Sequence, residues 1–252
     1  MKHILIIYLS CSILLSCNKS TKTESIAPQA GDLSITPTFS AGTQSFSFDT
    51  PLVNDSSANY TISSCRYYLS DIRLTQKNGT IVEVDTVFLV SPNRAAFTLK
   101  NIPSSEYSKF EFTLGLDSVL NHKDPAIYPL SHPLAYQSPA IHWSWNTGYI
   151  FMMIEGSCDT TQNNNGTTEF GSYPQAMFYH IGMDEFKRNI SLSYDFSVST
   201  NSGNNLNLNL DINKILKGLN IKKENATHSM MSGYGLAKKV ANNFPSSFTL
   251  SK

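Results

Sequence analysis

The stretch "CRYYLSDIRLTQKNGTIVEVDTVFLV", Cys65 to Val90, decides the fold. Polar and apolar residues alternate on both sides of Asn78-Gly79, a dipeptide that favours the tight turn of a β-hairpin. The segments "CRYYLSDIRLT" and "TIVEVDTVFLV" are therefore predicted to be two antiparallel strands.

Short β segments continue this pattern in both directions from the hairpin. The segments that show it are "AAFTLKNIP", "YSKFEFTLGL", "QAMFYHIGM", "NISLSYDFSVS" and "NLNLNLDINKIL". Helix is minor, with short turns predicted at "NKILKGLN" and "LAKKVANNF". Residues 33–252 are therefore predicted to form one all-β domain, an antiparallel β-sandwich of the immunoglobulin-like or jelly-roll-like kind.

The strand pattern breaks in a proline-rich and histidine-containing stretch, "DSVLNHKDPAIYPLSHPLAYQSPA", from Asp117 to Ala140. Proline lacks an amide donor and disfavours both helix and central strand, so this stretch is predicted to be a loop. Loops of this length without regular structure are usually functional.

The N-terminus has the form of an export signal. A basic start and an apolar run lead to "LLSC", which resembles a bacterial lipobox, so residues 1–16 are interpreted as a lipoprotein signal peptide and Cys17 as the lipidated residue. The alternative is a plain cleaved signal beside an ordinary cysteine. Residues 17–32 are predicted to be a flexible linker. The expected location is the bacterial cell envelope, lipid-anchored at the outer membrane and facing the periplasm or the surface.

Charge and motifs narrow the function classes. With 19 basic and 19 acidic residues the net charge is zero, which makes nucleic acid a poor partner. No hydrolase, zinc-protease or phosphate-binding motif is found, so the chain is not expected to be an enzyme. Two cysteines remain after export, Cys65 and Cys158. They could form a disulfide or be two unrelated buried thiols.

Histidine is the residue type that could carry chemistry. Outside the signal the chain has His122, His132, His142, His180 and His228. Imidazole binds copper and zinc well, although a single histidine is more often a surface or hydrogen-bonded residue. His180 shares a strand face with Phe178, where a buried imidazole would need a partner such as a metal.

Both tryptophans lie in "HWSWNTGYIFMMIEG", His142 to Gly156. Alternation places Trp143 and Trp145 on one face of a strand and His142 on the other, which makes His142 the weakest ligand candidate near the indoles. Packing explains one indole, and the other is a candidate for oxidation. The pairs Met152-Met153 and Met230-Met231 could supply soft sulfur for cuprous copper or could be packing residues, which is favoured for the first pair.

The motifs "YYLSDIRL", "FTLGLDSVLN", "HKDPA", "HWSWNTGYIFMMIEG" and "FYHIG" resemble, in order, those of the MbnP-like family of methanobactin-cluster copper-binding proteins. The resemblance extends from about Leu33 to the C-terminus, and its most specific element is the pattern from Trp143 to Phe151. It implies an exported or membrane-anchored β-sandwich that binds copper through histidines.

The resemblance also implies which histidines bind the copper and which kind of enzyme is the partner. His122 matches the histidine of the family's "NH-x-D-P" segment and His180 that of "HIG", while His132 and His228 are further ligand candidates. In such proteins a tryptophan near the metal is oxidised to kynurenine by a dihaem enzyme of the cytochrome c peroxidase type, similar to MbnH. The chain departs from the pattern in lacking a cysteine shortly after "HIG".

Two functions therefore remain open. One is copper acquisition or handling, which predicts that His122 and His180 converge near an indole. The other is a non-catalytic structural or glycan-binding envelope lipoprotein whose aromatic loop face stacks on sugars.

Overall fold

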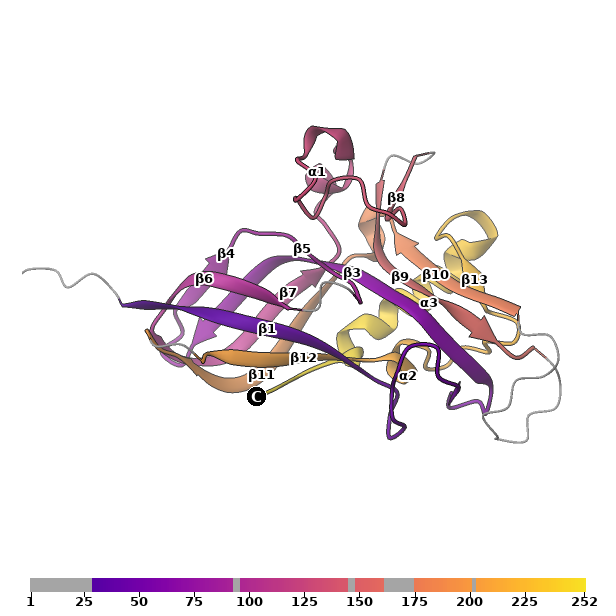
Figure 1. The fold of residues 1–252 in the computed structure, drawn as a ribbon, viewed down its shortest axis with the longest axis horizontal. Coiled ribbons are helices and arrows are strands. Elements are labelled where there is room, and N and C mark those ends of the chain that lie inside the picture. Colours follow the sequence, from indigo (N-terminus) through magenta and orange to yellow (C-terminus); the bar gives the residue numbers. More distant parts are fainter. Residues whose placement is uncertain (1–28, 93–95, 145–147, 161–174, 201–202) are drawn as a thin grey trace, which may run out of the picture.

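A computed structural model describes residues 29–92, 96–144, 148–160, 175–200 and 203–252 (Figure 1). The first strand, β1, begins at Ala30, three residues before the predicted start of the domain at Leu33. The signal, the lipidation candidate Cys17, most of the linker and Trp145 lie outside the described residues.

The larger sheet holds most of the strands. Its order is β11-β7-β3-β9-β10-β13, with β2, β4 and β5 paired to β3 and β8 paired to β9. The bounds of these strands are β2 Leu52–Val53, β3 Asn59–Gln76, β4 Ile81–Val84, β5 Phe88–Val90, β7 Ser105–Leu114, β8 His142–Trp143, β9 Gly148–Cys158, β10 Gln175–Gly182, β11 Arg188–Val198 and β13 Ala226–Thr227.

The smaller sheet has the order β14-β12-β1-β6. Its strands are β1 Ala30–Ser40, β6 Phe97–Pro103, β12 Asn205–Asp211 and β14 Phe248–Ser251. The helical elements are α1 Ser118–Asn121, η1 Pro125–Ile127, η2 Asp184–Phe186, α2 Ile212–Ile215, η3 Met231–Gly233 and α3 Tyr234–Ser247. Within the described ranges, no helix has both the length and the hydropathy needed to cross a membrane.

The predicted fold class is confirmed: two sheets form a sandwich with little helix. The hairpin around Asn78-Gly79 is present, with Thr75 opposite Ile81 and Gly79 at a φ of 88°. Two pairings differ from the expected antiparallel pattern, because β1 with β12 and β10 with β13 run parallel. A tight turn fixes the direction of neighbouring strands only, so the direction of pairs that are remote in sequence leaves no local signal.

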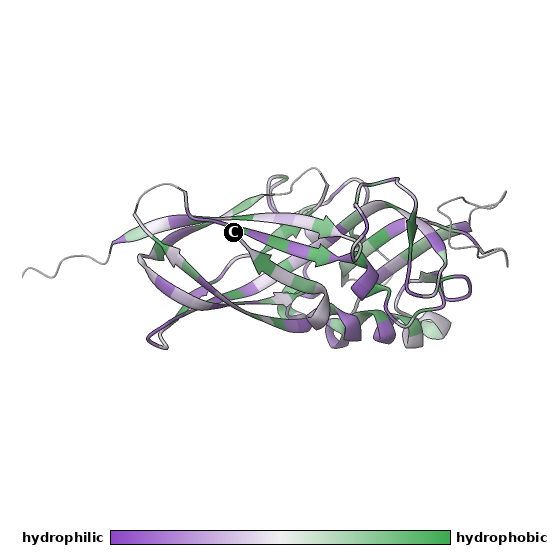
Figure 2. Ribbon diagram, turned by 90° about the horizontal axis from the view of Figure 1, so that it is seen from below, coloured by the Kyte–Doolittle hydropathy of each residue, from purple (hydrophilic) through white to green (hydrophobic). Residues whose placement is uncertain are grey.

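The main core lies between the two sheets. In β12 the side chains of Leu206, Leu208 and Leu210 are buried and alternate with asparagines, as the period-two pattern predicts. Hydrophobic and hydrophilic residues alternate along the strands in Figure 2. On β10 the core side is occupied by Met177, Tyr179 and Ile181, so His180 points to the opposite face of the sheet.

A second core covers the outer face of the larger sheet. Along β9, Met152 and Ile154 enter the main core, while Phe151 and Met153 enter a cluster that includes Trp143. The continuous apolar run of this strand follows from burial on both faces. Met152 and Met153 are therefore packing residues, as favoured above.

The segment from Asp117 to Ala140 forms the lid of this second core and projects from the top of the molecule in Figure 1. Side chains of the larger sheet donate hydrogen bonds to backbone carbonyls of this segment. The hydroxyl of Tyr68 donates to Pro133 O (3.1 Å), that of Tyr149 to Leu134 O (2.6 Å), and Arg66 Nη1 donates to Pro139 O (2.7 Å). These bonds order a loop whose prolines prevent regular pairing.

The two cysteines are separate buried thiols, which corrects the disulfide alternative. Cys65 lies opposite Ile154 and Cys158 lies opposite Tyr60, so about four residues of strand separate them along the sheet. At about 3.4 Å per residue this spacing is far longer than the Cα separation that a disulfide spans.

Candidate functional site

His180 and His228 meet on the outer face of the larger sheet. Their Nδ1 atoms are 3.2 Å apart and their ring centroids 4.9 Å apart. His180 is on β10, and His228 directly follows β13, which pairs in parallel with β10. Ser229, the residue after His228, binds to β10 and so keeps His228 close to His180. Its hydroxyl donates to His180 O (2.8 Å) and accepts from the amide of Gly182 (3.1 Å).

Glu155, on the neighbouring strand β9, orients the His180 ring. Its Oε1 lies 3.0 Å from His180 Nε2. A carboxylate accepts hydrogen bonds, so His180 donates from Nε2 and carries its lone pair on Nδ1, the atom that faces His228. Carboxylate partners of this kind fix ligating histidines in many metal sites.

Burial favours the neutral, ligating form of His180. Its side chain is 13 % exposed. Desolvation lowers the pKa of His180 most; the hydrogen bond and charge of Glu155 oppose this effect, and the charge of His228 adds to it. The imidazole therefore keeps a lone pair to lower pH than an ordinary histidine.

The spacing of the two nitrogens suits one metal ion. Two imidazole nitrogens that face each other 3.2 Å apart lie within reach of a single ion, which both could bind. Without a metal, a proton on His228 Nδ1 can lie between the two nitrogens. To hold an ion through Nδ1, a neutral His228 would carry its proton on Nε2 instead.

Trp143 packs over Gly182, two residues along β10 from His180. It is 2 % exposed and shares the second core with Met153, the residue opposite His180 in the sheet. The edge of the indole lies over Gly182: a Cβ built on that glycine would be 2.6 Å from Trp143 Cζ3 and 2.5 Å from Tyr149 O. The bare backbone of Gly182 is therefore what allows the indole to approach β10.

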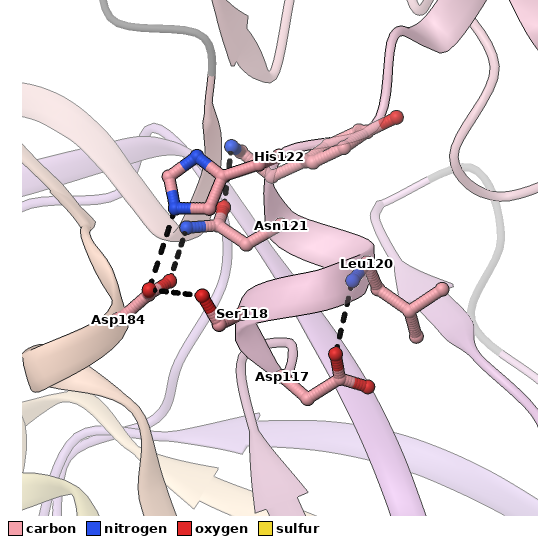
Figure 3. A network of polar contacts seen from close by, with 7 residues as sticks. Asp117, Ser118, Leu120, Asn121, His122 and Asp184 are labelled. Carbon is pink, nitrogen blue, oxygen red and sulfur yellow. Dashed lines mark hydrogen bonds and ion pairs between the residues drawn. The ribbon is translucent and has the colours of Figure 1, made fainter.

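His122 belongs to a different polar network, drawn in Figure 3. Asp184 accepts hydrogen bonds from Ser118 Oγ (2.6 Å), Asn121 Nδ2 (2.7 Å) and His122 Nε2 (3.3 Å). Asn121 Oδ1 in turn accepts from the amide of Tyr149 (2.8 Å). The network joins α1 to β9 and η2. Together with Trp143, His122 and Asp184 line a cavity of about 270 Å³.

We expect the Asp184 network to lose its stabilising effect in acid. Burial raises the pKa of Asp184, but the hydrogen bonds from Ser118, Asn121 and His122 outweigh it and hold the pKa below its ordinary value. A lowered folded-state pKa stabilises the fold above the unfolded value of about 3.9, and this contribution is lost as pH falls through the folded pKa. Urea unfolding of Asp184→Asn measures the effect.

The variant should be less stable than the parent at pH 7 by about 1 kcal/mol or less, because the Asp184 carboxylate is 40 % exposed and screened by solvent. The difference between the two proteins should shrink below about pH 4. An equal difference at both pH values would show that the charge of Asp184 is not what stabilises the network.

The expectation that His122 and His180 converge is not met, because His180 pairs with His228 whereas His122 bonds Asp184. His122 contacts Asp184, not His180. His132 stacks on Tyr128 (4.3 Å between centroids), and its Nδ1 accepts from Leu134 N–H (3.1 Å). In the part of the chain that the structure describes, no group of three or more His, Cys, Asp or Glu side chains is placed to hold a metal ion. Among the described histidines, the pair whose ring nitrogens lie within hydrogen-bond distance is His180 and His228.

His142 lies away from the indole, on the other side of β8. Its ring contacts Tyr149 (4.8 Å between centroids), and it lines a cavity of about 420 Å³ together with His122 and Asp124. Burial lowers the pKa of His142 most, and the charge of Asp124 opposes that effect.

Sequence reasoning missed Glu155, Ser229 and Asp184. Each is a common polar residue that no ligand or catalytic spacing marks, and each reaches the site through strand pairing or a turn. Glu155 lies opposite Phe178, so the diagonal contact with His180 depends on the register of β9 and β10. That register could not be derived from either strand alone.

Comparisons with known proteins identify a matching family and a similar fold. The family model named MbnP matches residues 30–232. Among solved structures, MbnP from Methylosinus trichosporium is similar with a TM-score of 0.54 and 12 % sequence identity, over 77 % of this chain and 80 % of that chain. At this identity the likeness shows a shared fold. The search of curated proteins gives no match.

Proposed function

The chain belongs to the MbnP family, and from this premise we propose that it binds copper for acquisition or handling, without being an enzyme. His180 and His228 would hold the ion through their Nδ1 atoms, and Glu155 would orient His180 from outside the coordination shell. Copper would act there as bound cargo.

The observation that carries the proposal is the pair of imidazole nitrogens 3.2 Å apart, with a carboxylate behind one of them. Neutral imidazole nitrogens are common ligands for copper. His122 and His132 are not part of the proposed site, because each has a different partner in the structure.

Trp143 is the tryptophan that we propose to be oxidised. It packs over Gly182, two residues from His180, inside a cluster that excludes water. Indole itself offers an N–H donor and no lone pair for a metal, whereas kynurenine has an aniline nitrogen and a ketone. A dihaem partner of the cytochrome c peroxidase type would supply the oxidising power. The site would operate in the cell envelope, on a chain anchored through Cys17.

Sugar binding through Trp143 is disfavoured. An aromatic ring that stacks on a sugar must expose one face, and Trp143 is 2 % exposed. Tyr128 offers its face to His132 instead.

Metal analysis and intact-mass measurement of protein from its native host test the proposal together. We expect about one copper per chain and a peptide containing Trp143 that has gained an oxygen and lost a carbon, the change from tryptophan to kynurenine. Unmodified, copper-free protein that also fails to bind added cuprous copper would contradict the proposal.

A further inference from the structure

A loop rich in sulfur lies directly beside the histidine pair. It runs from Thr227 to Gly233 and presents Met230 and Met231 to a cavity of about 710 Å³ that His228 also lines. Met231 is 93 % exposed, an unusual position for a large apolar side chain, whereas Met230 is half-buried. In chain order the donors are an imidazole and, after Ser229, two adjacent thioethers.

Hydrogen bonds hold this loop in a strained shape. Thr227 Oγ1 donates to Gly233 O (2.8 Å) and accepts from Ser229 N–H (3.0 Å), which closes the loop on itself. Ser229 and Met231 have positive φ angles, 66° and 51°, which non-glycine residues adopt rarely. Strain of this kind persists only where surrounding contacts impose it, and it is concentrated at functional sites.

The same hydrogen bonds couple the loop to the proposed copper site. Ser229 is fully buried and bonds both His180 O and Gly182 N, so the loop and β10 move together. His228 contacts His180 on one side and lines the methionine cavity as well. His228 therefore belongs both to the proposed copper site and to the lining of the methionine cavity.

We propose that the loop from Thr227 to Gly233 is a capture site for cuprous ions, with the thioethers of Met230 and Met231 as its donors. Thioethers are soft ligands that favour cuprous over divalent ions. Because they are neutral and Met231 is open to solvent, the ion is held weakly here and passes to the histidine pair through His228. The proposal rests on copper binding at His180 and His228, and only ligands exchange in the transfer.

Transfer from a coloured cuprous chelate, such as the bicinchoninate complex, to the full mature chain without oxygen tests the capture site. In the double variant Met230→Leu and Met231→Leu, the rate of transfer should fall several-fold while the final amount of bound copper stays unchanged. Met231→His combined with Met230→Leu keeps one metal donor, so its transfer rate should lie between those of the double leucine variant and the parent. Leu130→Ala, which trims an exposed apolar side chain of the proline-rich loop, is the control and should transfer copper at the parent rate.

Two results would overturn the capture site: an unchanged rate in the double variant, or a folded double variant that no longer binds copper at the end point. The second would make the methionines part of the final site. A separate measurement isolates the capture site from the proposed function. In His180→Gln, silver(I), a probe for cuprous copper, should still shift the methyl NMR signals of Met230 and Met231. If His180→Gln keeps full copper affinity, the proposed function fails while this methionine test still decides the capture site.

Discussion

His180→Gln is expected to lower cuprous copper affinity by about 100-fold or more, since losing even an outer-shell partner of a ligating histidine costs about 10–100-fold. Glutamine keeps a polar side chain of similar length but removes the nitrogen that faces His228 at 3.2 Å. Competition with a cuprous chelator of known affinity measures the change.

Glu155→Gln tests the residue that orients His180 and should have a smaller effect than His180→Gln. The amide still reaches His180 Nε2, but it no longer offers a charged acceptor, so His180 loses part of its orientation and basicity. Copper affinity should fall by about 10–100-fold, less than in His180→Gln. This ordering distinguishes a ligand from a residue that acts through one.

His132→Gln is the matched control. His132 also has a lowered pKa, caused by burial, but it stacks on Tyr128 in the proline-rich loop. Its substitution should leave copper affinity unchanged. If His132→Gln and His180→Gln weaken binding equally, the ion does not lie between His180 and His228.

The hairpin and the alternating strands could be predicted because their signals are local. The turn at Asn78-Gly79 and the leucines of β12 each specify structure within a few residues. The second core could have been inferred from the same sequence. The run from Gly148 to Ile154 is continuously apolar, as expected of a strand that is covered on both faces.

The meeting of His180 and His228 could not be predicted, because it depends on a two-residue strand. Ala226 and Thr227 pair in parallel with Phe178 and Tyr179, 48 residues away in the sequence at the same register. A strand this short leaves no periodic pattern. The family resemblance pointed to His180, which the structure pairs with His228, and also to His122, whose side chain bonds Asp184.

Gly182→Ala is expected to lower the free energy of unfolding by roughly 2 kcal/mol, the usual cost of overpacking a well-packed interior. The new methyl group would lie 2.5 Å from Tyr149 O and 2.6 Å from Trp143 Cζ3, so both the backbone of β9 and the indole must move. Gly182 also lies at the register shift between β9 and β10. Urea unfolding measures the stability.

Gly235→Ala is the control, because a Cβ at that helical position of α3 meets nothing within 4 Å. It should leave the protein unchanged or stabilise it by up to about 1 kcal/mol. Combining Gly182→Ala with Trp143→Phe removes the ring atoms that clash. The two changes should therefore couple by about 1 kcal/mol, with the double variant more stable than the sum predicts.

This coupling also tests why the indole lies where it does. If Trp143 depends on the bare backbone of Gly182, the alanine variant should displace the indole from β10, weaken copper binding at His180 and reduce oxidation of Trp143 together. Strict additivity of the two substitutions, with copper affinity unchanged, would mean that the contact between Trp143 and Gly182 serves packing alone.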